Sequence, residues 1–211
     1  MNITSAKISF LNARSKIVRL VHPQMKHLSG YTAGNSPNTD ILPVVNMNGC
    51  FREFRLRFIC EEKGLLHPTV HLLLYNSKGK MLVQKRSMNK DSSPGKLSQS
   101  VGGHISKEGV SPSMRLIPKN TLKKETLEEL GIQMHQFKFL TSYYYESKKG
   151  KNRELVYLFE GKYDGRIRPN RSEVEWAGFF DLSAVNKLSL TKPELFSNSF
   201  LQDIYYLRRI S

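Results

Sequence analysis

Short apolar runs alternate with turn residues along most of the chain, and this pattern predicts a sheet built largely from hairpins. The runs at 71–76 and 80–86 flank the Gly-containing turn S-K-G-K, so they are expected to pair. The runs at 141–147 and 154–163 flank K-K-G-K-N-R and are expected to form a second pair. Another strand is expected at 174–182, where Trp and Phe residues favour packing.

Two windows interrupt this pattern with helical spacing. Asn120 or Thr121 is a candidate cap for a helix that runs to Leu130 and stops at Gly131. A second, amphipathic helix is expected in the C-terminal window entered at Pro193. Together the runs and windows predict an α/β (α+β) fold, in which a mixed sheet is combined with a few helices.

Composition limits the classes of protein to consider. The chain has 33 Lys and Arg against 18 Asp and Glu, a net charge of +15, which attracts phosphorylated small molecules, nucleic acid or acidic membrane surface. The sequence contains no basic repeat interleaved with aromatic residues, so no motif supports nucleic-acid binding. No apolar stretch approaches the roughly 20 residues of a membrane span, so no transmembrane segment is expected. The sequence does not set the oligomeric state, and a homodimer stays open.

The chain changes character near Asp40, its first acidic residue, which follows five Lys or Arg and a loop-like stretch. We therefore expect a basic N-terminal extension at 1–40, packing on the domain or a partner, and one domain at 41–211. Organelle targeting by residues 1–20 is the alternative, because they are amphipathic and lack acids. Otherwise a cytoplasmic location is expected.

The two cysteines, Cys50 and Cys60, give a further indication of compartment. Two are too few for a disulfide framework, which favours a reducing environment. The simplest interpretation of both is that they are small, buried, apolar residues.

Three glutamates gather on the first predicted helix. At 100° per residue, Glu125, Glu128 and Glu129 share a face about 100° wide. It adjoins the face of Leu122, Leu127 and Leu130. The plain interpretation is a solvated face with a Lys124–Glu128 pair at i,i+4. The functional interpretation is a site for a hard cation, because oxygen-only ligands on a rigid helix suit Mg²⁺ or Mn²⁺.

The segments S-V-G-G-H at 100–104 and K-E-T-L-E-E-L-G-I at 124–132 resemble the Nudix hydrolase box. The matching residues are Gly103, Glu125, Glu128, Glu129, Gly131 and Ile132. Lys124 stands where the box has arginine, Thr126 where it has an aliphatic residue, and Glu108 with Gly109 reverses the usual order. Seven extra residues lie in the loop between Val110 and Lys119. The resemblance implies a Nudix-type α/β/α sandwich with a mixed sheet and a glutamate-bearing catalytic helix.

Beyond the box, the order of motifs resembles the Nudix branch that includes isopentenyl diphosphate isomerase. In that branch the arginine and lysine of R-x-x-x-K grip the diphosphate, which implies this role for Arg86 and Lys90. The alternative interpretation is that Arg86 and Lys90 are solvated charges at a strand end.

The isomerase machinery itself is incomplete in this sequence. His67, His104 and Glu154 fall where two histidines and one glutamate would be. The positions of the isomerase cysteine, first glutamate and third histidine hold other residues, namely Gly102, Asn152 and Cys60. Loss of the cysteine with retention of the three helix glutamates favours hydrolysis. His67 and His104 are then substrate-contacting candidates, or satisfied structural histidines.

The resemblance implies an Mg²⁺- or Mn²⁺-dependent hydrolase that cleaves the diphosphate of a nucleoside diphosphate-linked or related small molecule. Glu125 is the leading base candidate and Glu128 the second catalytic candidate. The metal candidates are the carboxylates of Glu125, Glu128, Glu129 and Glu154. Two alternatives stay open: an isopentenyl diphosphate isomerase-like enzyme, and a non-catalytic module that binds nucleic acid or a partner. The second is favoured if the 110–119 insertion displaces the helix from the Gly-Gly-His segment.

Overall fold

The computed structural model describes residues 40–147 and 150–210, so the expected extension at 1–40 lies outside the described residues except for Asp40. The strands are β1 (Ile41–Val45), β2 (Phe51–Leu56), β3 (Leu66–Tyr75), β4 (Met81–Arg86), β5 (Leu97–Ser98), β6 (Val101–His104), β7 (Lys138–Glu146), β8 (Arg153–Lys162) and β9 (Val174–Phe180). The α-helices are α2 (Arg57–Lys63), α3 (Pro118–Leu130), α4 (Leu182–Thr191) and α5 (Asn198–Ile210). Two 3₁₀ turns are η2 (Lys107–Gly109) and η3 (Pro193–Leu195).

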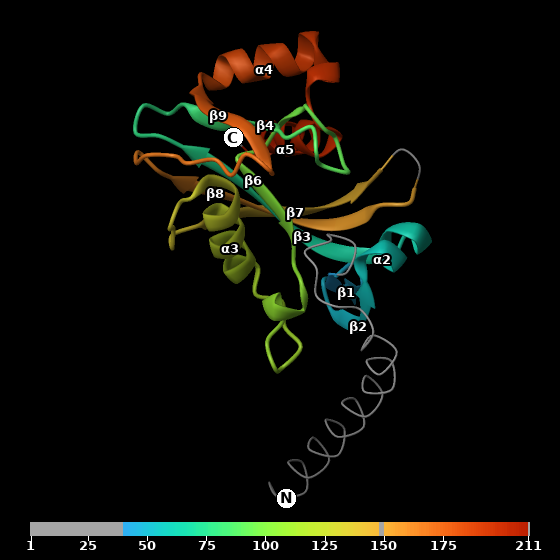
Figure 1. Cartoon of the computed structure of the whole chain (residues 1–211). Coiled ribbons are helices and arrows are strands. Elements are labelled where there is room, and N and C mark those ends of the chain that lie inside the picture. Colours follow the sequence, from blue (N-terminus) through green and yellow to red (C-terminus); the bar gives the residue numbers. More distant parts are fainter. Residues whose placement is uncertain (1–39, 148–149, 211) are drawn as a thin grey trace, which may run out of the picture. The chain divides into compact units, whose positions relative to one another are not determined.

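Strand β3 is the centre of the main sheet (Figure 1). It pairs in parallel with β8 from Leu66↔Arg153 to Tyr75↔Lys162, and antiparallel with β6. The sheet order is β5-β4-β3-β8-β7, with β6 added on β3 and β9 on β4, while β1 and β2 form a separate hairpin. Parallel and antiparallel pairs occur in one sheet, which confirms the expected mixed sheet.

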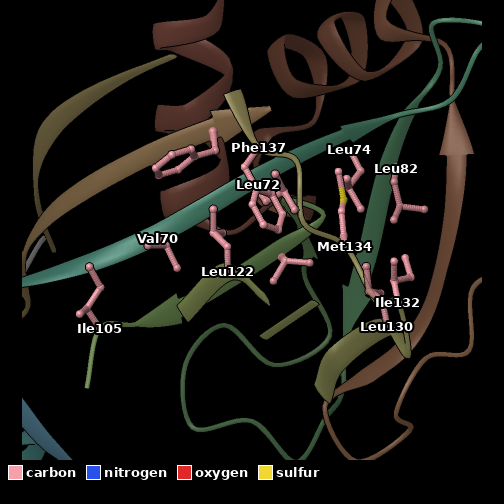
Figure 2. Close-up of a cluster of buried hydrophobic side chains, with 12 residues drawn as sticks. Val70, Leu72, Leu74, Leu82, Ile105, Leu122, Leu130, Ile132, Met134 and Phe137 are labelled. Atoms are coloured by element: carbon pink, nitrogen blue, oxygen red, sulfur yellow. The ribbon is translucent and has the colours of Figure 1, made fainter. Parts of the chain in front are cut away.

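The main sheet is covered by helices on both faces. On one face, α3 contributes Leu122 and Leu130 to a core with alternate β3 residues Val70, Leu72 and Leu74 (Figure 2). On the other face, Leu73 joins the buried side chains of α4 and α5, which are Val185, Phe200, Ile204 and Leu207. Because side chains alternate along a strand, β3 contributes side chains to both cores and is buried along nearly its whole length. This arrangement confirms the α/β/α sandwich.

Both predicted hairpins are present, but β3 and β4 pair in register only at Tyr75↔Met81, because β6 pairs with β3 at Thr69–Leu72. The β3–β4 turn is closed by the hydrogen bond from Asn76 N to Lys80 O, with Gly79 at φ +71°. Glycine is favoured there because positive φ strains residues with a Cβ. Strands β7 and β8 pair antiparallel, and β9 covers most of the strand expected at 174–182.

The helix boundaries differ from the sequence expectation. Helix α3 begins at Pro118 with Ile117 as its N-cap, so the expected cap at Asn120 or Thr121 is wrong. Proline is well suited to the first helical position, because it lacks the N–H that would have no partner there. The expected stop is confirmed: Gly131 takes the left-handed conformation and donates its N–H to the last turn.

The C-terminal region is also more divided than expected. Pro193 opens only the short turn η3, and α5 starts at Asn198. Helix α4, which the sequence analysis did not anticipate, precedes them.

The two cysteines differ: Cys60 is buried as expected, whereas Cys50 is exposed. No helix within residues 40–147 and 150–210 is long and apolar enough to cross a membrane.

Candidate active site

The three glutamates of helix α3 differ in how far they are buried. Glu129 is buried, Glu125 is half-buried, and Glu128 is exposed. Glu128 lies 3.8 Å from Lys124 Nζ, which is the i,i+4 pair expected from the sequence. Of the three leucines that share the adjoining face, Leu122 and Leu130 are buried, whereas Leu127 is 48% exposed. The side of α3 that faces the sheet instead carries Thr126, whose hydroxyl donates back to Leu122 O.

Glu129 is held by a partner from the sheet. Gln84 of β4 donates from Nε2 to Glu129 Oε2 at 3.0 Å, and both side chains are buried. Burial raises the pKa of Glu129 to about 7, although the Gln84 hydrogen bond and the charges of Lys90 and Arg86 lower it. Gln84 was not singled out in the sequence. Its signal was a polar residue among the buried apolar positions of β4.

Glu125 packs directly on the backbone of β6. A Cβ added to Gly103 would lie 2.5 Å from Glu125 Cδ, a separation that real Cβ atoms essentially never show. Burial, followed by the charge of Glu129, raises the pKa of Glu125 to about 8. Two close carboxyl groups with raised pKa values are the environment that a divalent cation stabilises, because its charge removes their repulsion. The donor set therefore fits Mg²⁺ or Mn²⁺ held by Glu125 and Glu129, with Glu128 on the exposed flank.

The insertion in the box does not separate α3 from β6. Val110 pairs with Leu116 in an isolated bridge, and Ile117 N donates to Gly109 O at 2.7 Å. The extra residues thus form a loop whose ends meet just before α3. The displacement that would favour a non-catalytic module is not observed.

The charges of Arg86 and Lys90 both act on Glu129, but the two side chains have different partners. Arg86 Nε donates to Ser92 O at 2.9 Å. Burial lowers the pKa of Arg86, while the charges of Glu129, Glu173 and Glu154 oppose this shift. Lys90 forms an ion pair with Glu173, an acid that the sequence analysis did not identify. Arg86 is therefore within electrostatic range of the glutamates of α3 and of Glu154 on β8.

A second group of ligand atoms lies on the other face of the sheet. Among the described residues, His67, His104 and Glu154 are the group of three whose ligand atoms lie within 4.8 Å of one another. The sheet register explains this meeting, because His67 is opposite Glu154 on β8 and the next residue on the same face, Thr69, is opposite His104 on β6. The structure thus groups Glu154 with the two histidines, which the sequence analysis had assigned to substrate contact.

The chemistry of these three residues suits a metal. Nε2 of His67 and Nε2 of His104 are buried and lack a hydrogen-bond partner among the described residues. Burial, followed by the charge of Arg57, lowers the pKa of His104 well below its ordinary value. A neutral imidazole with a free nitrogen is a metal ligand. Glu154 accepts hydrogen bonds from Asn152 Nδ2 at 2.5 Å and from Thr69 Oγ1 at 3.4 Å, which orient it as a second shell orients a ligand.

The three positions that depart from the isomerase pattern have distinct surroundings. A Cβ on Gly102 would lie 2.4 Å from Gln99 Nε2, so the amide of Gln99 takes the space that a cysteine side chain would need. Asn152 supports Glu154, as described above. Cys60 is fully buried with Leu42 and Val44 in the small core of β1 and α2.

Comparisons with known proteins agree with this fold. The NUDIX domain family matches residues 65–199. Isopentenyl-diphosphate Delta-isomerase of Burkholderia multivorans is 24% identical over 147 residues, which cover 66% of this chain and 79% of that protein. Isopentenyl-diphosphate delta-isomerase 2 of Homo sapiens is 27% identical over 124 residues, covering 54% of this chain and 55% of the human protein, so the chain spans about half of it.

Solved structures share the fold at low sequence identity. DR0079 from Deinococcus radiodurans superposes with a TM-score of 0.62 at 18% identity, covering 81% of this chain and 99% of that chain. The NUDIX domain of Shewanella oneidensis NrtR, complexed with ADP ribose, gives 0.51 at 17% identity and covers 69% and 86%. The resemblance found in the sequence, including its isomerase-like branch, is confirmed. Because the family match covers well over half of the chain, this protein belongs to the NUDIX domain family.

Proposed function

We propose that this protein is a divalent-cation-dependent pyrophosphohydrolase that cleaves the diphosphate linkage of a small molecule. The observation that carries the proposal is the pair Glu125 and Glu129, which are half-buried and buried respectively and raised in pKa, together with the half-buried cation Arg86, whose charge acts on Glu129. Membership of the NUDIX domain family supports the same class of enzyme.

Each residue of the pair has a role that follows from its surroundings. Glu129, fixed by Gln84, is the better placed metal ligand, because its carboxylate is buried and oriented. Glu125 is half-buried with its pKa raised to about 8, so its carboxylate, once kept ionised by the charge of a bound cation, would be a stronger base toward an attacking water than an ordinary glutamate. When bound, Mg²⁺ or Mn²⁺ would lower the pKa of a bound water and neutralise charge on the diphosphate.

Arg86 and Lys90 supply the positive charge that a diphosphate needs. Arg86 would donate to phosphoryl oxygens, and Lys90 would exchange its ion pair with Glu173 for the substrate. The substrate beyond the diphosphate is proposed to be a nucleoside diphosphate-linked or related molecule, and the ADP-ribose bound by the Shewanella oneidensis NrtR domain is one example to test.

The direct test is release of phosphate-containing products from a panel of nucleoside diphosphate compounds in Mg²⁺ or Mn²⁺. Cleavage of at least one compound, abolished by a chelator and restored by metal, is the expected result. No cleavage in either metal contradicts the proposal.

An isomerase-like activity is the second candidate, because the curated relatives are isomerases and the group of His67, His104 and Glu154 is present. Gly102 carries no side chain to move a proton, and Gln99 fills the adjacent space. We therefore expect no isomerisation. Incubation with isopentenyl diphosphate in deuterated buffer checks this, since deuterium entering carbon without release of phosphate would favour the isomerase.

A further inference from the structure

The insertion in the box has no role in the proposed mechanism, yet it is a loop held by its own hydrogen bonds. Ser111 N donates to Arg115 O at 2.8 Å, and Met114 N donates to Ser111 O at 2.8 Å. Met114 has a φ of +59°, a conformation that strains a residue with a Cβ. Such strain is kept where the surrounding structure imposes it, and it is frequent at ligand sites.

This loop forms one wall of a cavity of about 490 Å³. The other walls come from the turn that joins β1 to β2 and from strand β8. The side chains that matter for a ligand are Met114, Arg115 and Leu116 of the loop, Cys50 and Phe51 of the turn, and Tyr157 of β8. Small-molecule sites in proteins commonly have volumes of about 300 to 1,000 Å³, so this cavity has the size of a binding site.

The cavity is separate from the candidate active site. Tyr157 on β8 and Gly103 on β6 are both opposite Val70, on the two sides of β3. Val70 is fully buried in the core under α3, so β3 and this core separate Tyr157 from Gly103 and the adjoining Glu125. No glutamate of α3 lines the cavity. A ligand bound there would leave the proposed metal ligands free.

The apolar part of the cavity suits a flat ring. Phe51 and Tyr157 offer aromatic surface, and Met114 offers a thioether, a group that packs well on aromatic rings. Leu116 extends this apolar surface. An aromatic ligand would therefore exclude water from four side chains at once.

The polar part of the cavity suits an anion. The guanidinium of Arg115 forms no ion pair or side-chain hydrogen bond within residues 40–147 and 150–210, so its charge is available to a ligand. The hydroxyl of Tyr157 also has no hydrogen-bond partner in this part of the chain. Burial, followed by the charge of Cys50, raises the pKa of Tyr157, which keeps the hydroxyl a donor.

We propose that this cavity is a second ligand site that binds a small aromatic anion, such as a nucleoside monophosphate. The ring would pack on Phe51 and Tyr157, and the anionic group would accept hydrogen bonds from Arg115. The inference goes beyond the proposed function, because the site is separate from that of the diphosphate and needs no metal. A neutral ring would leave Arg115 without a partner, and a phosphate without a ring would leave the apolar surface in water. Both halves of the ligand are therefore required.

Cys50 makes the test local to the cavity. It lines the cavity and is exposed, whereas Cys60, the other cysteine of the chain, is fully buried with its pKa raised to about 11. Alkylation of Cys50 by N-ethylmaleimide is followed by mass spectrometry of the full-length protein in the presence of a chelator. At about ten times its dissociation constant, AMP should slow alkylation by about tenfold, because only the free protein reacts.

Two fragments of AMP serve as controls for the ligand. Adenosine and ribose 5-phosphate, at the same concentration, should each slow alkylation by less than about twofold, because each makes only part of the contacts. No protection by millimolar AMP overturns the inference. Equal protection by either fragment overturns it as well.

Variants provide the second arm. Arg115→Gln should weaken the binding of AMP by about tenfold or more, the loss expected for a charge-assisted contact. Arg166→Gln, at another exposed arginine, is the matched control and should bind AMP as the unmodified protein does. Unweakened binding in an Arg115→Gln protein with unchanged thermal melting overturns the inference. In Glu129→Gln the protection of Cys50 should persist, and its loss would show that AMP acts from the active site instead.

Discussion

Gly103 of β6 and Glu125 of α3 are packed so closely that a Cβ on the glycine would lie 2.5 Å from the glutamate Cδ. A glycine is therefore required at this position of the box, because any side chain there would collide with Glu125, the proposed base. The contact links the β6 backbone to the proposed chemistry of α3.

Gly103→Ala is expected to displace the Glu125 carboxyl and lower turnover by roughly 100-fold, because small misplacements of a catalytic group are costly. The stability loss should stay within about 1 to 3 kcal/mol, the usual range for overpacking. Steady-state kinetics and urea denaturation measure the two effects. Gly178→Ala is the matched control, because a Cβ there would make only ordinary contact with Phe180. Equal activity in both variants would contradict the proposed role of Glu125.

Glu129→Gln should abolish metal-dependent turnover while leaving the fold intact. The amide oxygen can still accept the Gln84 hydrogen bond, but it carries no charge for the cation. The rise in melting temperature that Mg²⁺ produces in the unmodified protein should disappear in this variant. Glu160→Gln, which alters a carboxylate paired with Lys138 on the surface, should behave as the unmodified protein. Unchanged turnover in Glu129→Gln would rule out this ligand.

The stability of the metal-free protein should fall as pH rises from about 4.5 to about 8. The folded-state pKa values of Glu125 and Glu129 are raised from 4.5 to about 8 and about 7. In that window the folded state binds more protons than the unfolded state, so the free energy of unfolding decreases with pH. Denaturation curves with and without Mg²⁺ check this, since the cation should reduce the loss. In Glu125→Gln the pH dependence should be smaller; an unaltered slope would contradict the assignment.

Arg86→Ala and Lys90→Ala should each lower catalytic efficiency by about 10- to 150-fold, the loss expected for a charge-assisted contact worth about 1.5 to 3 kcal/mol. Lys85→Ala is the control, because Lys85 is paired with Glu175 and is not proposed to contact the diphosphate. Effects below twofold at both Arg86 and Lys90 would show that these residues are solvated charges only.

His104→Ala should reduce the metal content of the purified protein if the group of His67, His104 and Glu154 holds an ion. Elemental analysis after dialysis measures this directly. His135→Ala, which removes an exposed histidine, is the control. Equal metal content in all three proteins would leave the two imidazoles without a metal role.

The sequence by itself determined the local elements. Alternating apolar runs around glycine turns indicated the hairpins β3–β4 and β7–β8, because the period of a strand and the positive φ of a turn residue are local properties. The stop of α3 at Gly131 is local for the same reason. The start of α3 was misplaced, because Ile117 and Pro118 define it through backbone geometry rather than through a capping side chain.

The tertiary structure decided which side chains of these elements are buried and which lie next to one another. Helical periodicity placed three glutamates on one face, but only packing against β4 and β6 distinguishes buried Glu129, half-buried Glu125 and exposed Glu128. Sheet register, which joins strands far apart in the chain, brought Glu154 to His67 and His71 to Gly102. The bond between His71 and Asp203 spans 132 positions. Such contacts leave no periodic signal in the sequence, because they arise from the meeting of separate strands and helices in the folded chain.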